Sequence, residues 1–166
     1  MLHVPLQEIV RQASPLNARL FGNFMSLARN PDPRSEFAQK TEVARHDLTD
    51  AEYAEWLLGQ HYRSVLFLEQ DETFVGQVTF QEHEGIPHVF SVWVSAALRK
   101  KGLGTLMVRE FLIDVYDEGI RRVQIGNGGH EAVSRICGHA VDGDLDLPFR
   151  VTAGQGPGWL ELSPIH

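Results

Sequence analysis

The sequence lacks the features that mark secreted and membrane proteins. Cys137 is its only cysteine, so no disulfide can form within the chain, and we expect a reducing compartment, the cytoplasm. No apolar run approaches the ~20 residues that a membrane-spanning helix needs. The first residues contain no basic segment followed by an apolar one, so they do not resemble a signal peptide. We therefore expect no membrane partner.

Positive charge is also scarce. Lys and Arg together number 15 against 22 Asp and Glu, which gives a formal net charge of −7. A nucleic-acid-binding domain normally presents a basic face, so this balance argues against a nucleic-acid partner. It mildly favours a neutral or cationic partner, although solubility alone explains the charge equally well. No metal is expected either, because Cys137, His130 and His139 match no common zinc spacing.

The hydrophobic pattern predicts a mixed α/β (α+β) fold. Helical spacing alternates with strand-like alternation along the chain, and Thr49 with Glu52 forms a capping box at one helix start. The expected helices span residues 16–29, 49–60, 102–118 and 130–140, and the expected strands span 64–69, 74–81, 88–94, 122–125, 149–153 and 159–162. This order predicts an antiparallel meander, then a βαβα unit and a C-terminal hairpin, with helices on both faces of one mixed sheet.

A basic loop carries the clearest chemical signal. A strand ends near Val94, and a helix begins at about Gly102 after Arg99-Lys100-Lys101. The first turn of a helix has free N–H groups and a partial positive charge, and glycine lets a bulky anion approach the backbone. The segment therefore predicts a diphosphate site. It is neither a P-loop nor a dinucleotide fingerprint, since the required Lys-Ser/Thr and the third glycine are missing.

The same residues point to a family. Arg99-Lys100-Lys101-Gly102-Leu103-Gly104 resembles the (Arg/Gln)-x-x-Gly-x-Gly/Ala signature of the GCN5-related N-acetyltransferase (GNAT) superfamily, and the element order over residues 64–162 is similar to that fold. The resemblance implies one GNAT-like domain over residues 1–166. In it, residues 64–162 form the acyl-coenzyme A-binding core, and residues 1–60 form a helical region on the acceptor side.

The resemblance also implies roles for residues of this chain. The co-substrate would be acetyl-coenzyme A. Its pantetheine arm would lie along Val92, Trp93 and Val94. Its pyrophosphate would be held by the loop and helix start, which comprise Arg99, Lys100, Lys101, Gly102, Leu103, Gly104 and Thr105.

A later family motif matches only in part. Asn127 and Gly138 have the spacing of its asparagine and its glycine, which assigns Asn127 to the cofactor, but the position of the usual tyrosine falls on Ser134. A second register that starts at Gly129 places Ile136 there instead. Ser134 is the candidate that donates a hydrogen bond to the leaving thiolate, although a hydroxyl is a poor acid.

His88 is the preferred general base for an attacking amine. It lies eleven residues before Arg99, where histone-type members of the superfamily have a glutamate, and an imidazole titrates near ~6.5. A polar strand-end residue is the structural alternative for His88. The group Glu82, His83 and Glu84 is a second candidate, and an acyl intermediate on Cys137 is a minor alternative to direct attack.

The resulting prediction is an N-acetyltransferase that moves an acetyl group to a small-molecule or peptide amine by direct attack in a ternary complex. A catalytically silent acyl-coenzyme A sensor and an enzyme with a longer acyl donor are the alternatives. We expect the acceptor pocket to involve residues 15–60, 82–87 and 154–158. The oligomeric state is open, with a homodimer among the expectations.

Overall fold

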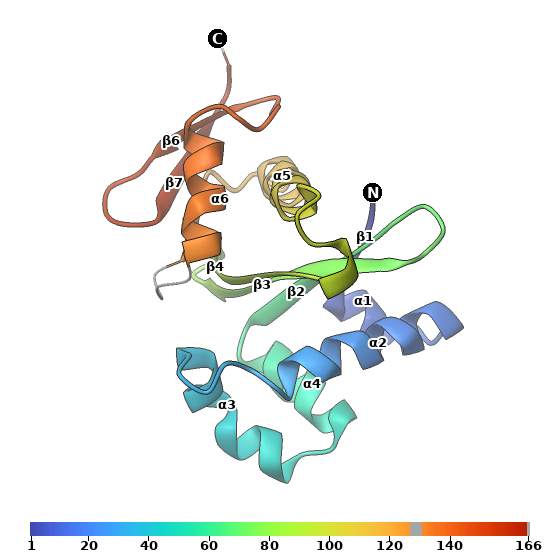
Figure 1. Ribbon diagram of the computed structural model, residues 1–166. Helices are drawn as coiled ribbons and strands as arrows, with labels where there is room; N and C mark the ends of the chain where they lie inside the picture. Colours follow the sequence, from blue (N-terminus) through green and yellow to red (C-terminus); the bar gives the residue numbers. More distant parts are fainter. Residues whose placement is uncertain (127–130, 166) are drawn as a thin grey trace.

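The computed structural model describes residues 1–126 and 131–165 and contains one seven-stranded mixed sheet (Figure 1). The strand order is β1-β2-β3-β4-β5-β7-β6. Only β4 and β5 run parallel, and each other neighbouring pair is antiparallel. The strands are β1 (Leu2–Pro5), β2 (Tyr62–Leu68), β3 (Phe74–His83), β4 (Ile86–Val94), β5 (Arg122–Ile125), β6 (Arg150–Ala153) and β7 (Trp159–Ser163).

Helices cover both faces of the sheet, which confirms the predicted architecture. Four of them lie on one side in Figure 1, and α5 and α6 lie on the other. The first group comprises α1 (Leu6–Arg11), α2 (Pro15–Ala28), α3 (Glu36–Asp47) and α4 (Asp50–Gly59). The second comprises α5 (Leu103–Asp117) and α6 (Glu131–Val141), with the short 3₁₀ helix Ala96–Leu98 just before α5. None of the helices in the described ranges is long and apolar enough to cross a membrane.

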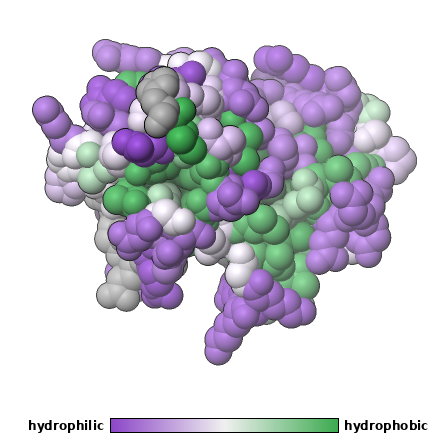
Figure 2. All heavy atoms as spheres, turned by 90° about the horizontal axis from the view of Figure 1, so that it is seen from above, coloured by the Kyte–Doolittle hydropathy of each residue, from purple (hydrophilic) through white to green (hydrophobic). Residues whose placement is uncertain are grey.

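Each face of the sheet has its own hydrophobic core. Phe67, Val78 and Met107 are buried between the sheet and α5, whereas Leu66 and Leu57 are buried between the sheet and α1–α4. Alternate residues of β2 thus enter different cores, as the two-residue period of a strand requires. Some apolar surface stays visible between hydrophilic margins on the α5 and α6 side (Figure 2), where Leu106 and Val141 are exposed.

The N-terminal region departs from the sequence expectation. Residues 1–60 are not purely helical, because residues 2–5 form the edge strand β1, which pairs with β2. The four-residue strand ends at a proline and is too short to show a period. Helix α3 was also not expected. Its buried side chains are the small residues Ala38, Thr41 and Ala44, so it has no marked apolar stripe.

Gly76 lies where the backbone of β4 packs closely against β3. A Cβ atom there would lie 2.1 Å from the carbonyl oxygen of Trp93, and that backbone cannot yield without moving β4. We predict that Gly76→Ala lowers the free energy of unfolding by about 3 kcal/mol, the upper part of the range for an overfilled interior. Urea unfolding followed by circular dichroism measures this loss.

Gly22 provides the matched control. It is exposed in the middle of α2, and a Cβ there would meet nothing within 4 Å. Gly22→Ala should raise the free energy of unfolding by about 0.5–1 kcal/mol, because alanine loses less backbone entropy in a helix. Equal stabilities of the two variants would contradict the assigned β3–β4 contact.

Candidate functional site

The strands β4 and β5 separate after a short contact. They pair only at His88 with Gln124 and at Val89 with Ile125, and the N–H of Gly126 donates to the carbonyl of Val89 over 2.9 Å. Within the described part of the chain, residues 91–94 of β4 pair with β3, and no residue from 90 to 94 pairs with β5. One edge of β4 is therefore left without a partner strand in the middle of the sheet.

A β-bulge lies at the point of separation. Thr79 pairs with Ser91 and Phe80 pairs with Val89, so Phe90 is an extra residue in β4. A bulge bends its strand and changes which side chains share a face. As a result, His88, Phe90, Ser91 and Trp93 all line a cavity on the α1–α4 side of the sheet.

The N-terminus of α5 lies directly beyond β4. Gly102 precedes the helix with a φ of 74°, a left-handed conformation that glycine adopts without strain, and the first turn has no acidic residue. The first helical hydrogen bond is from the N–H of Leu106 to the carbonyl of Gly102. No described residue accepts from the amides of Leu103, Gly104 or Thr105, so these donors face outward with the positive end of the helix dipole.

The basic residues before α5 are exposed, and none of them forms an ion pair with a described carboxylate. The Nε of Arg99 donates to the carbonyl oxygen of Val94 over 2.9 Å, and its guanidinium lies 5.8 Å from the centre of the Trp93 ring. Arg99 is thereby fixed against the end of β4. Lys100 has a φ of 66°, which sharpens the turn toward the helix.

The predicted cofactor residues of β4 lie on its two faces. Val92 and Val94 pack toward α5, and a Cβ at Gly104 would lie 3.5 Å from Val94 and 4.0 Å from Val92. Trp93 points the other way, into the cavity, where its ring stacks on Phe74 at 5.9 Å. The strand end and the helix start are therefore in direct contact, as a continuous binding surface needs.

The cavity on the α1–α4 side has a volume of about 490 Å³. Its floor is formed by polar side chains of β3 and β4, and its walls come from α2, α3 and the loop between them. Three aromatic rings form one wall, with Phe37 5.2 Å from both Phe90 and Tyr62. Of the expected acceptor region, residues between 24 and 40 and residue 83 line the cavity. Residues 154–158, which were also expected there, do not line it.

His88 lies at the β5 end of this cavity. Its ring meets the rings of His83 and Trp159 edge-on, at 4.4 Å and 5.4 Å between centres. Burial lowers the pKa of His88 below its ordinary value, and the positive charge of His83 lowers it further, while a hydrogen bond with Gln124 acts in the opposite direction. The imidazole is therefore mainly neutral near pH 7 and able to accept a proton.

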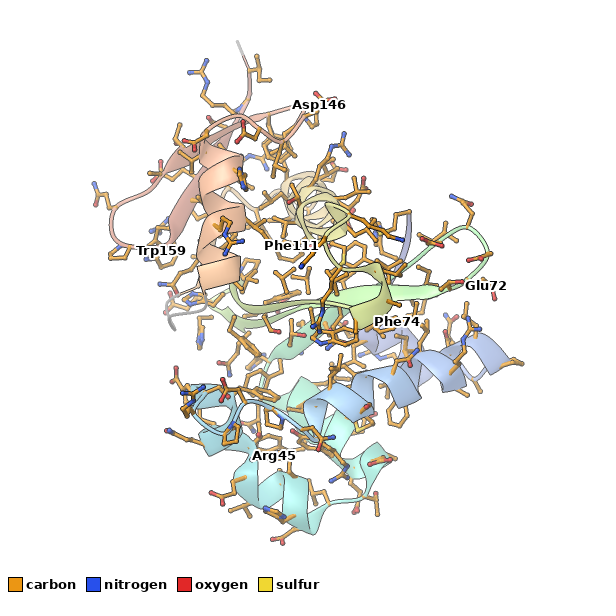
Figure 3. All side chains as sticks on the ribbon, in the orientation of Figure 1. Arg45, Glu72, Phe74, Phe111, Asp146 and Trp159 are labelled. Atoms are coloured by element: carbon orange, nitrogen blue, oxygen red, sulfur yellow. The ribbon has the colours of Figure 1, made fainter. Side chains whose placement is uncertain are left out.

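The Phe74 and Trp159 side chains mark the two ends of the site in Figure 3. Trp159 of β7 contacts His88, and Phe74 of β3 contacts Trp93. Of the second candidate group, only His83 lines the cavity. Glu82 faces a different pocket, where its Oε2 lies 3.9 Å from Nε of Arg63.

Three of the candidate residues lie beyond what the structure shows. Asn127 is outside the described residues, and the side chains of Ser134 and Cys137 are outside them too, although both positions belong to α6. The sequence analysis placed the residues of α3 in the acceptor region without expecting a helix there, and it missed Gln77. The alternation of Gln77, Thr79 and Gln81 was a usable signal, since it gives one face of β3 a polar row.

No metal centre is evident in residues 1–126 and 131–165. They contain no group of three or more His, Cys, Asp or Glu side chains that could hold a metal ion. The described residues of the site offer a neutral imidazole, exposed helix amides and a polar cavity.

Comparison with known proteins shows which family model matches the chain. The model of the acetyltransferase (GNAT) family matches residues 30–135, which is more than half of the chain. A search of curated proteins found no significant match.

Solved acetyltransferase structures are similar to this chain, and Tetrahymena GCN5 shares its fold. Tetrahymena GCN5 is 12% identical over 99% of this chain and 97% of its own, with a TM-score of 0.51. An aminoglycoside 6'-acetyltransferase type Ii is 14% identical over 100% and 99% of the two chains, with a TM-score of 0.49. The PaiA N-acetyltransferase from Thermoplasma acidophilum, solved in complex with coenzyme A, is 13% identical over 99% and 100%, with a TM-score of 0.45.

The environment of His88 leads to a prediction about its titration. Because a protonated His83 opposes a second positive charge 4.4 Å away, removing it in His83→Ala should raise the pKa of His88 toward its ordinary value. Proton–nitrogen NMR of the imidazole resonances against pH measures the shift. As a control, His46→Ala changes a histidine of α3 that contributes nothing to this shift, and an equal response to both changes would contradict the assignment.

Proposed function

Because the chain belongs to the GNAT family of acetyltransferases, we propose that it transfers the acetyl group of acetyl-coenzyme A to an amine by direct attack in a ternary complex. The observation that carries the proposal is the separation of β4 from β5 directly after Val89. It leaves one edge of β4 without a partner strand. This edge begins beside the neutral imidazole of His88 and leads, at the end of the strand, to the exposed amides of α5.

The residues at the strand end fit a coenzyme A molecule. The unpaired edge of residues 90–94 offers backbone groups to the two amides of a pantetheine arm. The amides of Leu103, Gly104 and Thr105, with the charges of Lys100 and Lys101, fit a pyrophosphate. No described carboxylate occupies that helix end, so the anion would find its donors free.

His88 is the proposed general base. The acceptor amine arrives as an ammonium ion and must lose a proton before its nitrogen can attack the thioester carbon. His88 would take this proton and release it to solvent. As the carbon–nitrogen bond forms, the carbon–sulfur bond breaks and its electron pair remains on sulfur. The second proton of the amine then neutralises the thiolate.

The acceptor amine would enter through the cavity on the α1–α4 side. His88 and the polar row of β3 lie on that face, while the helix amides and Val92 and Val94 lie toward α5. Amine and thioester would thus approach from opposite faces of the sheet and meet at the gap between β4 and β5. A thiol has an ordinary pKa near ~8.5, so the thiolate can leave without a strong acid.

We predict that His88→Ala lowers kcat by about 10²–10⁴-fold, the range that a positioned general base contributes. The affinity for coenzyme A should stay unchanged, because His88 lies at the other end of β4 from the helix amides. In the unaltered protein the rate should fall as the pH drops through the lowered pKa of His88, since the imidazolium cannot accept a proton. Thiol release with a panel of amines, measured from pH 5 to 9, gives both quantities.

Thiol release, together with thermal shifts in the presence of acyl-coenzyme A, separates the proposed acetyltransferase from the two alternatives. Stabilisation by acetyl-coenzyme A without thiol release for any amine would leave only a silent acyl-coenzyme A-binding protein. Larger thermal shifts with long-chain acyl-coenzyme A than with acetyl-coenzyme A would indicate a longer acyl donor, since the tighter ligand stabilises more. An unchanged rate in His88→Ala would remove His88 as the base.

We also predict that Gly104→Glu abolishes coenzyme A binding. The added carboxylate would lie beside the helix amides and repel the phosphates. Gly104→Ala is the control, because its Cβ would meet Val94 at an ordinary 3.5 Å and should leave binding nearly intact. Isothermal titration calorimetry with coenzyme A compares the two variants. Retained affinity in a folded Gly104→Glu protein would place the phosphates elsewhere.

A further inference from the structure

One wall of the cavity on the α1–α4 side is made of aromatic rings from three different elements. Phe37 of α3 stacks on Phe90 of β4, with 5.2 Å between the ring centres and 25° between the ring planes. It also meets Tyr62 of β2 edge-on at 5.2 Å, and Tyr62 meets Phe90 edge-on at 6.0 Å. Each ring thus contacts both of the others, so the wall is in place before a ligand arrives.

Two of these rings keep part of their surface open. Phe37 and Phe90 are half-buried and line the cavity, whereas Tyr62 is only 5% exposed. Leu27 and Pro31 add further half-buried apolar side chains to the lining. A ligand that covers this surface removes it from water, which stabilises the complex. The wall therefore favours a ligand with an apolar group.

The polar floor of the cavity demands little from a ligand. The amide nitrogen of Gln81 donates to the carbonyl of Gln60 over 2.9 Å. The hydroxyl oxygen of Thr79 lies 3.2 Å from that of Ser64. These groups already have partners inside the protein, so an apolar ligand above them deprives them of no hydrogen bond.

The charges that line the cavity favour neither sign. Glu36 and Lys40 lie 2.7 Å apart, and Asp32 and Arg34 lie 3.6 Å apart. All four side chains are exposed, and exposed ion pairs contribute little. A second charge of either sign on the acceptor would find an opposite charge here. The aromatic wall is therefore the better guide to the kind of acceptor.

The position of Phe90 along β4 brings the wall close to the proposed base. His88 and Phe90 are two residues apart in the strand, which is ~7 Å, and both line the cavity. An amine nitrogen beside His88 is therefore a short chain of atoms away from a ring that contacts Phe90. The extra residue of the bulge is thus the one that supplies this part of the wall.

We propose that Phe37 and Phe90 determine acceptor specificity, and that the acceptor is an amine with an aromatic ring a few bonds from the nitrogen. This inference rests on the amine acetylation proposed above. The nitrogen would lie beside His88, and the ring would cover the open surface of Phe37 and Phe90. These two side chains would contact the acceptor and take no part in proton transfer.

The test compares 2-phenylethylamine, 2-cyclohexylethylamine and 2-(2-methoxyethoxy)ethylamine by thiol release. The second amine has a ring that is not flat, and the third has a polar chain in place of the ring. The unaltered protein should prefer the phenyl compound to the cyclohexyl compound in kcat/KM by about 2–10-fold, the range for a pair of aromatic rings. It should prefer the phenyl compound to the ether by about tenfold or more, since a single lost methylene contact in an apolar pocket already costs this much.

Phe37→Ala and Phe90→Ala each remove one ring from the wall. Either change should lower the preference for the phenyl compound over the ether by about fivefold or more, because the ring of the acceptor loses a partner. The kcat/KM for the ether should stay within about twofold in both variants. Since one change lies on α3 and the other on β4, agreement between them does not depend on how either element adjusts.

Phe21→Ala is the matched control. Phe21 of α2 is also half-buried and packs against the same core, but it does not line the cavity. The preferences of the unaltered protein should persist in this variant. The inference would be overturned by a cyclohexyl compound or an ether that reacts as well as the phenyl compound, or by a preference that the changes at Phe37 and Phe90 leave intact. An equal loss of preference in Phe21→Ala would overturn it too.

Calorimetric binding of the same amines to the protein with coenzyme A keeps the two proposals distinguishable. If no amine releases thiol, the acetylation proposed above fails, yet the ratio of dissociation constants for the phenyl compound and the ether still reports on the aromatic wall. If thiol is released from other amines while 2-phenylethylamine fails to bind, the acetylation stands and the acceptor class is wrong.

Discussion

The arrangement of the whole site depends on the gap that opens between β4 and β5 after Val89. Neighbouring strands of a sheet normally satisfy each other's backbone groups, and unpaired groups in an interior are costly. Here the extra residue Phe90 bends β4 away from β5, and the chain continues into an exposed helix start. The gap leaves the β5-facing edge of residues 90–94 without a partner strand in the described chain, and His88 at its start lines the cavity on the α1–α4 side.

The two faces of β4 have different surroundings. Val92 and Val94 join the core beneath α5 and bring the strand against Gly104, whereas Ser91 and Trp93 face the cavity. The bulge makes this division possible because it brings His88 onto the same face as Ser91, although the two are an odd number of positions apart. A regular strand would turn His88 away from the cavity and toward the core beneath α5.

Features that depend on neighbouring residues could be predicted from the sequence, whereas some that depend on contacts between distant segments could not. The capping box of Thr49 and Glu52 forms as expected, because it depends on residues three positions apart. The loop from Arg99 to Gly104 lies at a helix start because a glycine and a strand end determine it locally. Helix α3 has too few apolar residues to show a helical period. The hydrogen bonds that link Ser64 of β2 to Thr79 and Gln77 of β3 depend on the register between the two strands, which neither segment encodes alone.

The polar row of β3 is held by hydrogen bonds that reach the neighbouring strand β2. Buried hydroxyl and amide groups in the middle of a sheet would destabilise the fold if they lacked hydrogen-bond partners. Here Ser64, Thr79 and Gln77 form a chain of hydrogen bonds in which each side chain satisfies the next. The chain of bonds starts at a backbone carbonyl and can end only at an acceptor. One unmet oxygen, the buried Oε1 of Gln77, is thus a consequence of its direction. The same three side chains therefore satisfy one another inside the sheet at every group but this one.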